Sequence, residues 1–450
     1  MIISPSKRWH SLPPVLAATL AISLAMTPQV VLAQNEQREG EEQQPYFGGV
    51  LYVESRLVDN ASRTADDNQK ITEAQAEYGA DVWARIDREL VALSADYQLY
   101  QNEYFEDTQE DQFIRTGQSA LVIGTENTFY QLDLGHSTQR FLADPAGPDI
   151  LENTDQRDIS TVSPLLRLRP GRNRISVAGH YAHIVYKETD INNSDRTGYS
   201  VSWIRDVSPI HSIGFDYMEN EVEYEVNNTG DYRYRRGSFV FSSELRLLQY
   251  TVQIGSNEVE PVVGSVVDGL FYDVAITHGN HRNTWTFTAQ QSITDTSIGN
   301  ANNPFFSEGI TSDASRLVQD QLERTSYGLA WRSNFLCFRC DLTIRAGYED
   351  EGFLNITTEN RIETFGGMAL RYRLRPSVNL ELILEHTKRE FAEDGGSDNY
   401  RQSTAVVALD IVPVLRYFET RFWYEYGERR PDIGFSYAVN AVGVTLGYVF

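Results

Sequence analysis

The last thirteen residues of the chain, 438–450, constrain its fold most strongly. Five large apolar residues occupy every second position of this segment: Val442, Val444, Leu446, Tyr448 and Phe450. Side chains of an extended strand point alternately to its two faces, so these five form one continuous apolar face. The pattern predicts a β-strand whose one face lies in an apolar environment.

The N-terminus has the layout of a secretory signal. Lys7 and Arg8 form a positive region, and residues 15–26 form an apolar core. Small residues then offer a cleavage site between Ala33 and Gln34. We therefore predict a signal peptide that ends at Ala33; an uncleaved N-terminal membrane anchor is the alternative.

Bulk composition limits the classes of protein that fit. No apolar stretch near twenty residues follows the N-terminus, and the mean hydropathy is −0.40, so helical membrane spans are excluded. A membrane-spanning strand needs only ~10 residues with one apolar face. The formal net charge of −24 argues against nucleic acid as a partner.

Alternating segments repeat from Tyr46 to the end of the chain. Clear examples are residues 248–254, 342–348 and 378–384. Residues 71–86 contain Ala and Glu, as a helix would, but they follow period two with Trp83 as the one exception. Several runs extend to about ten residues, beyond the usual ~5–6 of globular strands.

The connections between these segments are of two kinds. We predict tight turns at 170–173, 208–211, 376–377 and near Pro413, and long polar loops at 187–195, 227–231, 294–323 and 389–398. Short turns on one side and long loops on the other are typical of outer-membrane barrels. A sheet in lipid must close on itself, because lipid offers its backbone groups no partner.

The predicted fold is therefore all-β: a single transmembrane, antiparallel, up-and-down barrel. We count about twenty strands, with 16 to 20 compatible with the turns, and expect an even number. Residues 1–33 are then the signal peptide, 34–45 a flexible tail and 46–450 the barrel. Aromatic pairs such as Tyr181 and Tyr186, and the run 422–426, are expected at the membrane interfaces, unless they are simply good strand formers.

Cys337 and Cys340 form the chain's single CxxC motif. Structural zinc usually needs four ligands, and a thioredoxin-like motif needs a helix start, whereas this motif lies in a turn between strands. A local disulfide is the favoured interpretation. Unpaired thiols, and a redox or metal role, are the alternatives.

Seven charged residues are predicted to face the lumen from three neighbouring strands. They are Asp341, Arg345, Glu349, Arg371, Arg373, Glu381 and Glu385. Such charges set ion selectivity or bind a polar solute. Alternatively, they only hold the wall together through cross-strand pairs.

Neither catalytic chemistry nor a cofactor is expected. The eight histidines show no HExxH-like spacing that indicates a metal, and no GxSxG elbow occurs. A Ser-His-acid triad assembles in space rather than in sequence, so an enzyme acting on lipid or glycan remains an alternative.

Three hairpin segments carry a resemblance to a known family. They are residues 166–181, 203–217 and 372–380, each a strand, a Pro-containing turn and a return strand. With the terminal strand, they make the chain similar to the outer-membrane β-barrel porins found with exopolysaccharide and PEP-CTERM gene systems. The resemblance implies the bacterial outer membrane and a part in polysaccharide export, but no catalytic residues. The Cys337/Cys340 turn is a departure from it.

These observations predict a porin-like channel for polar solutes or for surface exopolysaccharide. The alternatives are an occluded structural or binding barrel, a barrel enzyme, and a secreted soluble β-protein. The expected partners are outer-membrane lipid, the barrel assembly machinery, which reads strands such as 442–450, and polysaccharide export components.

Overall fold

The computed structural model describes most of the chain after the predicted leader and tail. The described residues are 46–64, 69–125, 127–142, 150, 153–226, 230–280, 282–295, 320–334, 336–337, 339–357, 360–391, 399–412, 417–432 and 436–450. The predicted cleavage site, the tail and most of the loop 294–323 lie outside these residues. Within them, no helix is long and apolar enough to cross a bilayer.

Twenty strands make up the fold. They are β1 (Tyr46–Val58), β2 (Glu73–Arg88), β3 (Val91–Tyr104), β4 (Gln112–Ile123), β5 (Tyr130–Leu142), β6 (Thr154–Leu168), β7 (Asn173–Tyr186), β8 (Ser194–Ser208), β9 (His211–Tyr224), β10 (Tyr232–Glu244), β11 (Leu248–Pro261), β12 (Val267–Asn280), β13 (Asn283–Asp295), β14 (Gln321–Ser333), β15 (Cys340–Phe353), β16 (Arg361–Arg375), β17 (Val378–Phe391), β18 (Tyr400–Ile411), β19 (Phe418–Pro431) and β20 (Tyr437–Val449). A 3-10 turn, η2 (Asp190–Asn192), lies between β7 and β8.

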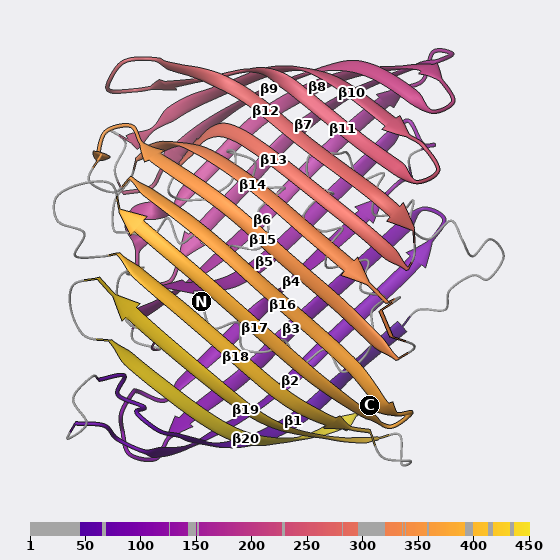
Figure 1. The fold of residues 1–450 in the computed structure, drawn as a ribbon. Helices are drawn as coiled ribbons and strands as arrows, with labels where there is room; N and C mark the ends of the chain where they lie inside the picture. Colours follow the sequence, from indigo (N-terminus) through magenta and orange to yellow (C-terminus); the bar gives the residue numbers. More distant parts are fainter. Residues whose placement is uncertain are drawn as a thin grey trace.

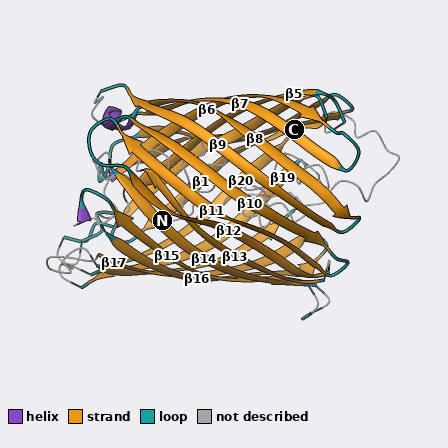
Figure 2. Ribbon diagram, turned by 90° about the horizontal axis from the view of Figure 1, so that it is seen from above, coloured by secondary structure: helices purple, strands orange, loops and turns teal. Residues whose placement is uncertain are grey.

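The sheet closes into a barrel. Each strand pairs antiparallel with the next, and β1 pairs with β20, so the strands form one continuous tilted wall (Figures 1 and 2). At the seam, Gly49 N–H donates to Phe450 O (3.2 Å) and Phe450 N–H donates to Gly49 O (3.0 Å). The predicted closed barrel, and the even strand number near twenty, are confirmed.

Connections of different length lie at the two ends of the barrel. The turns after even-numbered strands are short, as between β8 and β9 or β16 and β17. Most connections after odd-numbered strands are longer, those after β11 and β19 excepted, and the β13–β14 connection is the longest. The start of β1 and the end of β20 lie at the short-turn end. This end faces the periplasm in barrels of this kind, and the long connections face outward.

The outer surface is apolar. On β20, Val442, Leu446 and Phe450 are 53%, 58% and 58% exposed, whereas Thr445 on the opposite face is fully buried. Large exposed apolar residues recur on the same face of every strand pair, far beyond what a soluble monomer exposes. This surface fits the hydrocarbon of a bilayer and excludes the soluble alternative.

Aromatic side chains mark both edges of the apolar band. Trp285 and Trp331 stack at 5.4 Å near the short turns, and the hydroxyls of Tyr272 and Tyr327 lie 2.9 Å apart nearer the long connections. Tyr181 is also exposed on this outer surface.

Two of the predicted interfacial aromatics are instead inside. Tyr186 and Trp423 are 3% and 7% exposed, and Trp423 Nε1 donates to Glu54 (3.3 Å). The reason is parity: Tyr186 lies five residues from Tyr181, and an odd spacing puts two strand residues on opposite faces.

Four long connections share a cap that sequence reasoning missed. In each, the backbone N–H of the last strand residue, an aromatic, donates to an Asp or Asn seven residues later. The pairs are Tyr104–Asp111, Tyr186–Asn193, Tyr224–Asp231 and Phe353–Asn360, at 2.6–2.9 Å. The spacing of aromatic and Asx residues was the available signal, and the Asx side chain caps the strand end in each case.

Candidate functional site

The inner face of β14 to β19 carries paired charges along its whole height. Cross-strand partners in an antiparallel sheet point to the same side, so the pairing registers assign each residue to the lumen or the lipid. We call the ion-paired inward residues of these strands the charged wall. They are Arg324, Arg332, Asp341, Arg345, Glu349, Glu351, Arg361, Glu363, Arg371, Glu381, Glu385, Arg389, Asp410 and Arg421.

The seven predicted lumen charges all lie on the inner face of β15, β16 and β17, and six of them are in ion pairs. The pairs are Asp341–Arg332 (2.9 Å), Arg345–Glu385, Glu349–Arg324 and Arg371–Glu381 (3.5 Å). Arg373 is exposed near the short-turn end, and its backbone N–H donates to Arg339 O (2.8 Å). The wall is thus cross-linked, and it is also partly open to solvent, since the Arg345 side chain is 48% exposed.

The outer part of the charged wall is more deeply buried. Arg361 bonds Glu351, Arg389 bonds Glu363, and Arg324 lies between Glu349 and Glu351. Glu351, Arg361 and Arg389 are 1%, 5% and 3% exposed. Buried charges are tolerated only when paired and hydrogen-bonded, as they are here. Partners of the predicted residues, such as Arg324, escaped sequence reasoning because the pairing register was unknown.

Sequence reasoning also missed the extension of the wall to β18 and β19. Arg421 binds Glu381 (2.8 Å) and Asp410 (2.9 Å), which links β17, β18 and β19. Beside the seam, Arg56 lies between Glu54 (3.9 Å) and Glu77 (3.8 Å). The charged residues of β1, β18 and β19 alternate with apolar residues, and this alternation was the signal that could have identified them.

The outer end of β13 bends into the lumen. β13 pairs with β12 only as far as Gln291, and its later residues pair with β14 alone. Period two from the outward Trp285 places Ile293 and Asp295 on the lipid side, yet they are 2% and 0% exposed. The Asp295 carboxylate accepts hydrogen bonds from Arg196 of β8 (2.7 and 2.9 Å) and from the Tyr232 hydroxyl of β10.

An apolar cluster packs inside the barrel beneath this bend. Its members are Met218, Val222, Tyr224, Tyr232, Tyr234, Val259 and Ile293, from β9, β10, β11 and β13. Gly269 of β12 leaves room for it, because a Cβ there would lie 3.2 Å from Ile293 Cδ1. The outer half of the lumen is therefore narrowed on the side of β9 to β13, which adjoins the charged wall at β14.

Cys337 and Cys340 lie in the turn between β14 and β15, at the short-turn end. The structure joins them by a disulfide, with 5.4 Å between their Cα atoms. They lie at the other end of the barrel from the buried outer part of the charged wall, and their disulfide cross-links one periplasmic turn.

One group of potential metal ligands lies on the outer surface above Tyr181. His183, Asp195 and Glu225 offer ligand atoms within 4.8 Å of one another, and His183 Nδ1 lies 3.0 Å from Asp195. All three side chains are at least partly exposed. Exposed carboxylates of this kind are common without a metal, so the group does not define a site.

A closed sheet, an apolar outer face edged by aromatics, and an ionic interior together define an integral β-barrel of the bacterial outer membrane. The backbone groups of such a wall are satisfied by neighbouring strands, and its apolar face meets lipid. The predicted localisation is confirmed.

Comparisons with known proteins show a similarity of fold and none of sequence. No protein-family model and no curated protein matches the sequence. The chain is similar in structure to OccAB4 of Acinetobacter baumannii (8% identity, 92% of this chain and 100% of that chain, TM-score 0.37). It is also similar to opdK of Pseudomonas aeruginosa (8%, 90% and 98%, 0.38) and to the FrpB iron transporter of Neisseria meningitidis (8%, 90% and 82%, 0.49). Similarities of this size carry no information about function.

Proposed function

We propose that the barrel is a channel that passes polar solutes through the outer membrane along its charged wall. The supporting observation is the contrast between the two faces of β14 to β19. Their outer face is apolar, whereas their inner face carries ion pairs from Arg332 near the short turns to Glu351 near the long connections. A polar inner wall of this height suits hydrated solutes.

The outer mouth favours cations. Acidic residues dominate the long connections; residues 105–111, for example, contain four acids and no base. A mouth with one sign of charge raises the local concentration of the opposite ion, and salt screens the effect. The proposed channel therefore prefers cations, most strongly at low ionic strength.

Export of surface exopolysaccharide is the second candidate. It is supported by the hairpin resemblance and by the strand number, since barrels of this size are wide enough for an aqueous lumen. The apolar cluster under β13 opposes it, because it narrows the outer half. The same narrowing supports the alternative of an occluded structural barrel.

Conductance in planar bilayers tests the proposal. The mature protein is refolded in detergent, inserted, and measured with neutral polymers of graded size. Stable, cation-preferring steps are expected, and the polymer cutoff then separates a solute pore from a polysaccharide conduit. A folded, inserted barrel that never conducts contradicts the channel and supports the occluded barrel.

A further inference from the structure

The hairpin between β6 and β7 is the most basic part of an acidic chain. Residues 167–174 contain four arginines, and no Asp or Glu occurs between Asp158 and Glu188. The hairpin turns tightly: Asn173 N–H donates to Pro170 O (3.2 Å), and Gly171 has a φ of +67°, a conformation that favours glycine.

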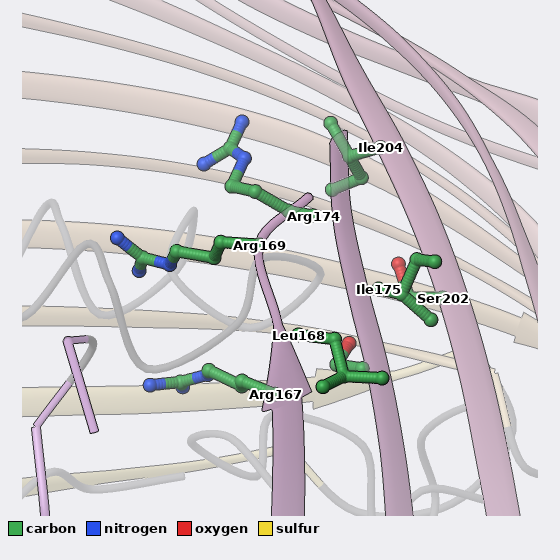
Figure 3. A pocket seen from close by; sticks show the side chains of 8 residues that line it. Arg167, Leu168, Arg169, Arg174, Ile175, Ser202 and Ile204 are labelled. Atoms are coloured by element: carbon green, nitrogen blue, oxygen red, sulfur yellow. The ribbon is translucent and has the colours of Figure 1, made fainter. Parts of the chain in front are cut away.

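The pairing register brings three of these arginines to the lumen side. Arg167 lies opposite Ser176, and Leu168 lies opposite Ile175, so Arg169 and Arg174 face each other at the next position. Period two places all three on the inner face. Their side chains extend to the same side of the hairpin (Figure 3). They line a small hollow together with Leu168, Ile175, Ser176, Ser202 and Ile204.

Neighbouring groups hold the guanidinium groups in position. Arg167, 8% exposed, donates to Thr125 O (3.2 Å), and Arg169 donates to Asn127 Oδ1 (3.1 Å). Arg174 pairs with Asp206 of β8 (3.0 Å). Gathering like charges is unfavourable unless an anion joins them, and the planar fork of arginine matches the two oxygens of a carboxylate or phosphate.

We infer that this hairpin is a binding site for the carboxylate or phosphate groups of solutes at the periplasmic mouth of the lumen. The hollow is large enough only for the anionic group itself, and its two serine hydroxyls can donate to that group while the rest of the solute, such as an acidic saccharide, lies in the lumen. The acidic outer connections repel such a solute, so it reaches the site from the periplasmic side. The inference deepens the proposed function. It rests on that function because the solute must pass along the lumen to and from this site.

Binding is measured without requiring an open pore. Folded protein in detergent is dialysed to equilibrium against oligogalacturonate, with a neutral maltooligosaccharide of equal length as the control ligand. We expect binding of the acidic ligand alone, competition by inorganic phosphate, and about tenfold weaker binding in Arg167→Gln/Arg174→Gln. The control is Arg205→Gln, which removes one arginine charge from the exposed, outward face of β8.

The outcomes separate the site from the channel. Unchanged binding in the double variant, or an equal loss in Arg205→Gln, overturns the site. If the glutamine variant fails to fold, Arg167→Lys/Arg174→Lys keeps the charge but removes the arginine fork, and undiminished binding then contradicts recognition by that fork. A barrel that binds the ligand but never conducts refutes the channel and leaves the site. A conducting barrel that binds no ligand refutes the site and leaves the channel.

Discussion

Arg345 on β15 and Glu385 on β17 form an ion pair that crosses the intervening strand, β16. The pairing register places both residues opposite Gly367. A Cβ atom at this glycine would lie 3.1 Å from Nε and 3.3 Å from Cγ of Arg345. The missing side chain therefore lets the guanidinium lie across β16, and one glycine permits a link between two non-adjacent strands.

Gly367→Val is expected to separate this ion pair while the barrel still folds. The valine methyls occupy the place of the Arg345 side chain, which turns into the lumen as an unpaired cation. Because the charges of Arg345 and Glu385 no longer neutralise each other at close range, we predict a changed ion preference, measured as the reversal potential in a salt gradient. The control is Gly366→Val, because a Cβ there has no atom within 4 Å. Equal reversal potentials in both variants would contradict this role of the pair.

Asp295→Asn tests the inward bend of β13. The Arg196–Asp295 pair is fully buried, and removing one partner of such a pair costs about 3–5 kcal/mol. We expect a lower urea midpoint of unfolding and, if the lumen conducts, a larger single-channel current because the bend loosens. Asp195→Asn removes a carboxylate next to Arg196, but on the exposed outer face. A midpoint unchanged in Asp295→Asn, or lowered equally in both variants, argues against the anchor.

The seam between β1 and β20 depends on a second glycine. The Phe450 ring lies over Gly49, where a Cβ would be 2.5 Å from Phe450 Cζ and 2.9 Å from Asp81 O. Gly49→Val is therefore expected to reduce the fraction of protein that migrates as a heat-modifiable barrel. Gly427→Val, at a position with free space, is the control. The assembly signal at residues 442–450 stays a prediction; loss of insertion in cells by Phe450→Ala, with normal folding in detergent, would support it.

Strand faces could be predicted from the sequence because period two is a local property. The outward positions of Val442 to Phe450 depend only on spacing along one strand. The same reasoning corrects the interfacial role of Tyr186, whose odd spacing from Tyr181 already implied the opposite face. The charged wall was found in part, since alternation identifies inward charges on β15 to β17.

Features that depend on distant residues could not be predicted in this way. The bend of β13 breaks its own alternation at Ile293, because Asp295 meets Arg196 from β8, about a hundred residues earlier in the chain. Likewise, the arginines of residues 167–174 were visible as charges. Their convergence on one hollow requires the β6–β7 register and the contribution of Ser202 from β8.

The disulfide is expected to add little stability. It joins residues separated by three positions, so the chain-entropy model gives it at most about 2 kcal/mol. Mass spectrometry without reductant should find Cys337 and Cys340 linked in protein purified from cells. The Cys337→Ser/Cys340→Ser variant should still fold into a heat-modifiable barrel. Two free thiols in the purified protein, or a variant that fails to fold, would contradict this account.

The most direct test of a conducting path along the charged wall is chemical modification of one lumen residue during a current recording. In the Cys337→Ser/Cys340→Ser background, Glu385→Cys places a thiol on the inner face, and Leu384→Cys places one on the lipid face, where Leu384 is 39% exposed. A negatively charged thiosulfonate reagent is then added to single channels. The account predicts a stepwise change in conductance at residue 385 and none at residue 384. An unchanged conductance at 385, with modification verified by mass, would show that ions do not pass along this wall.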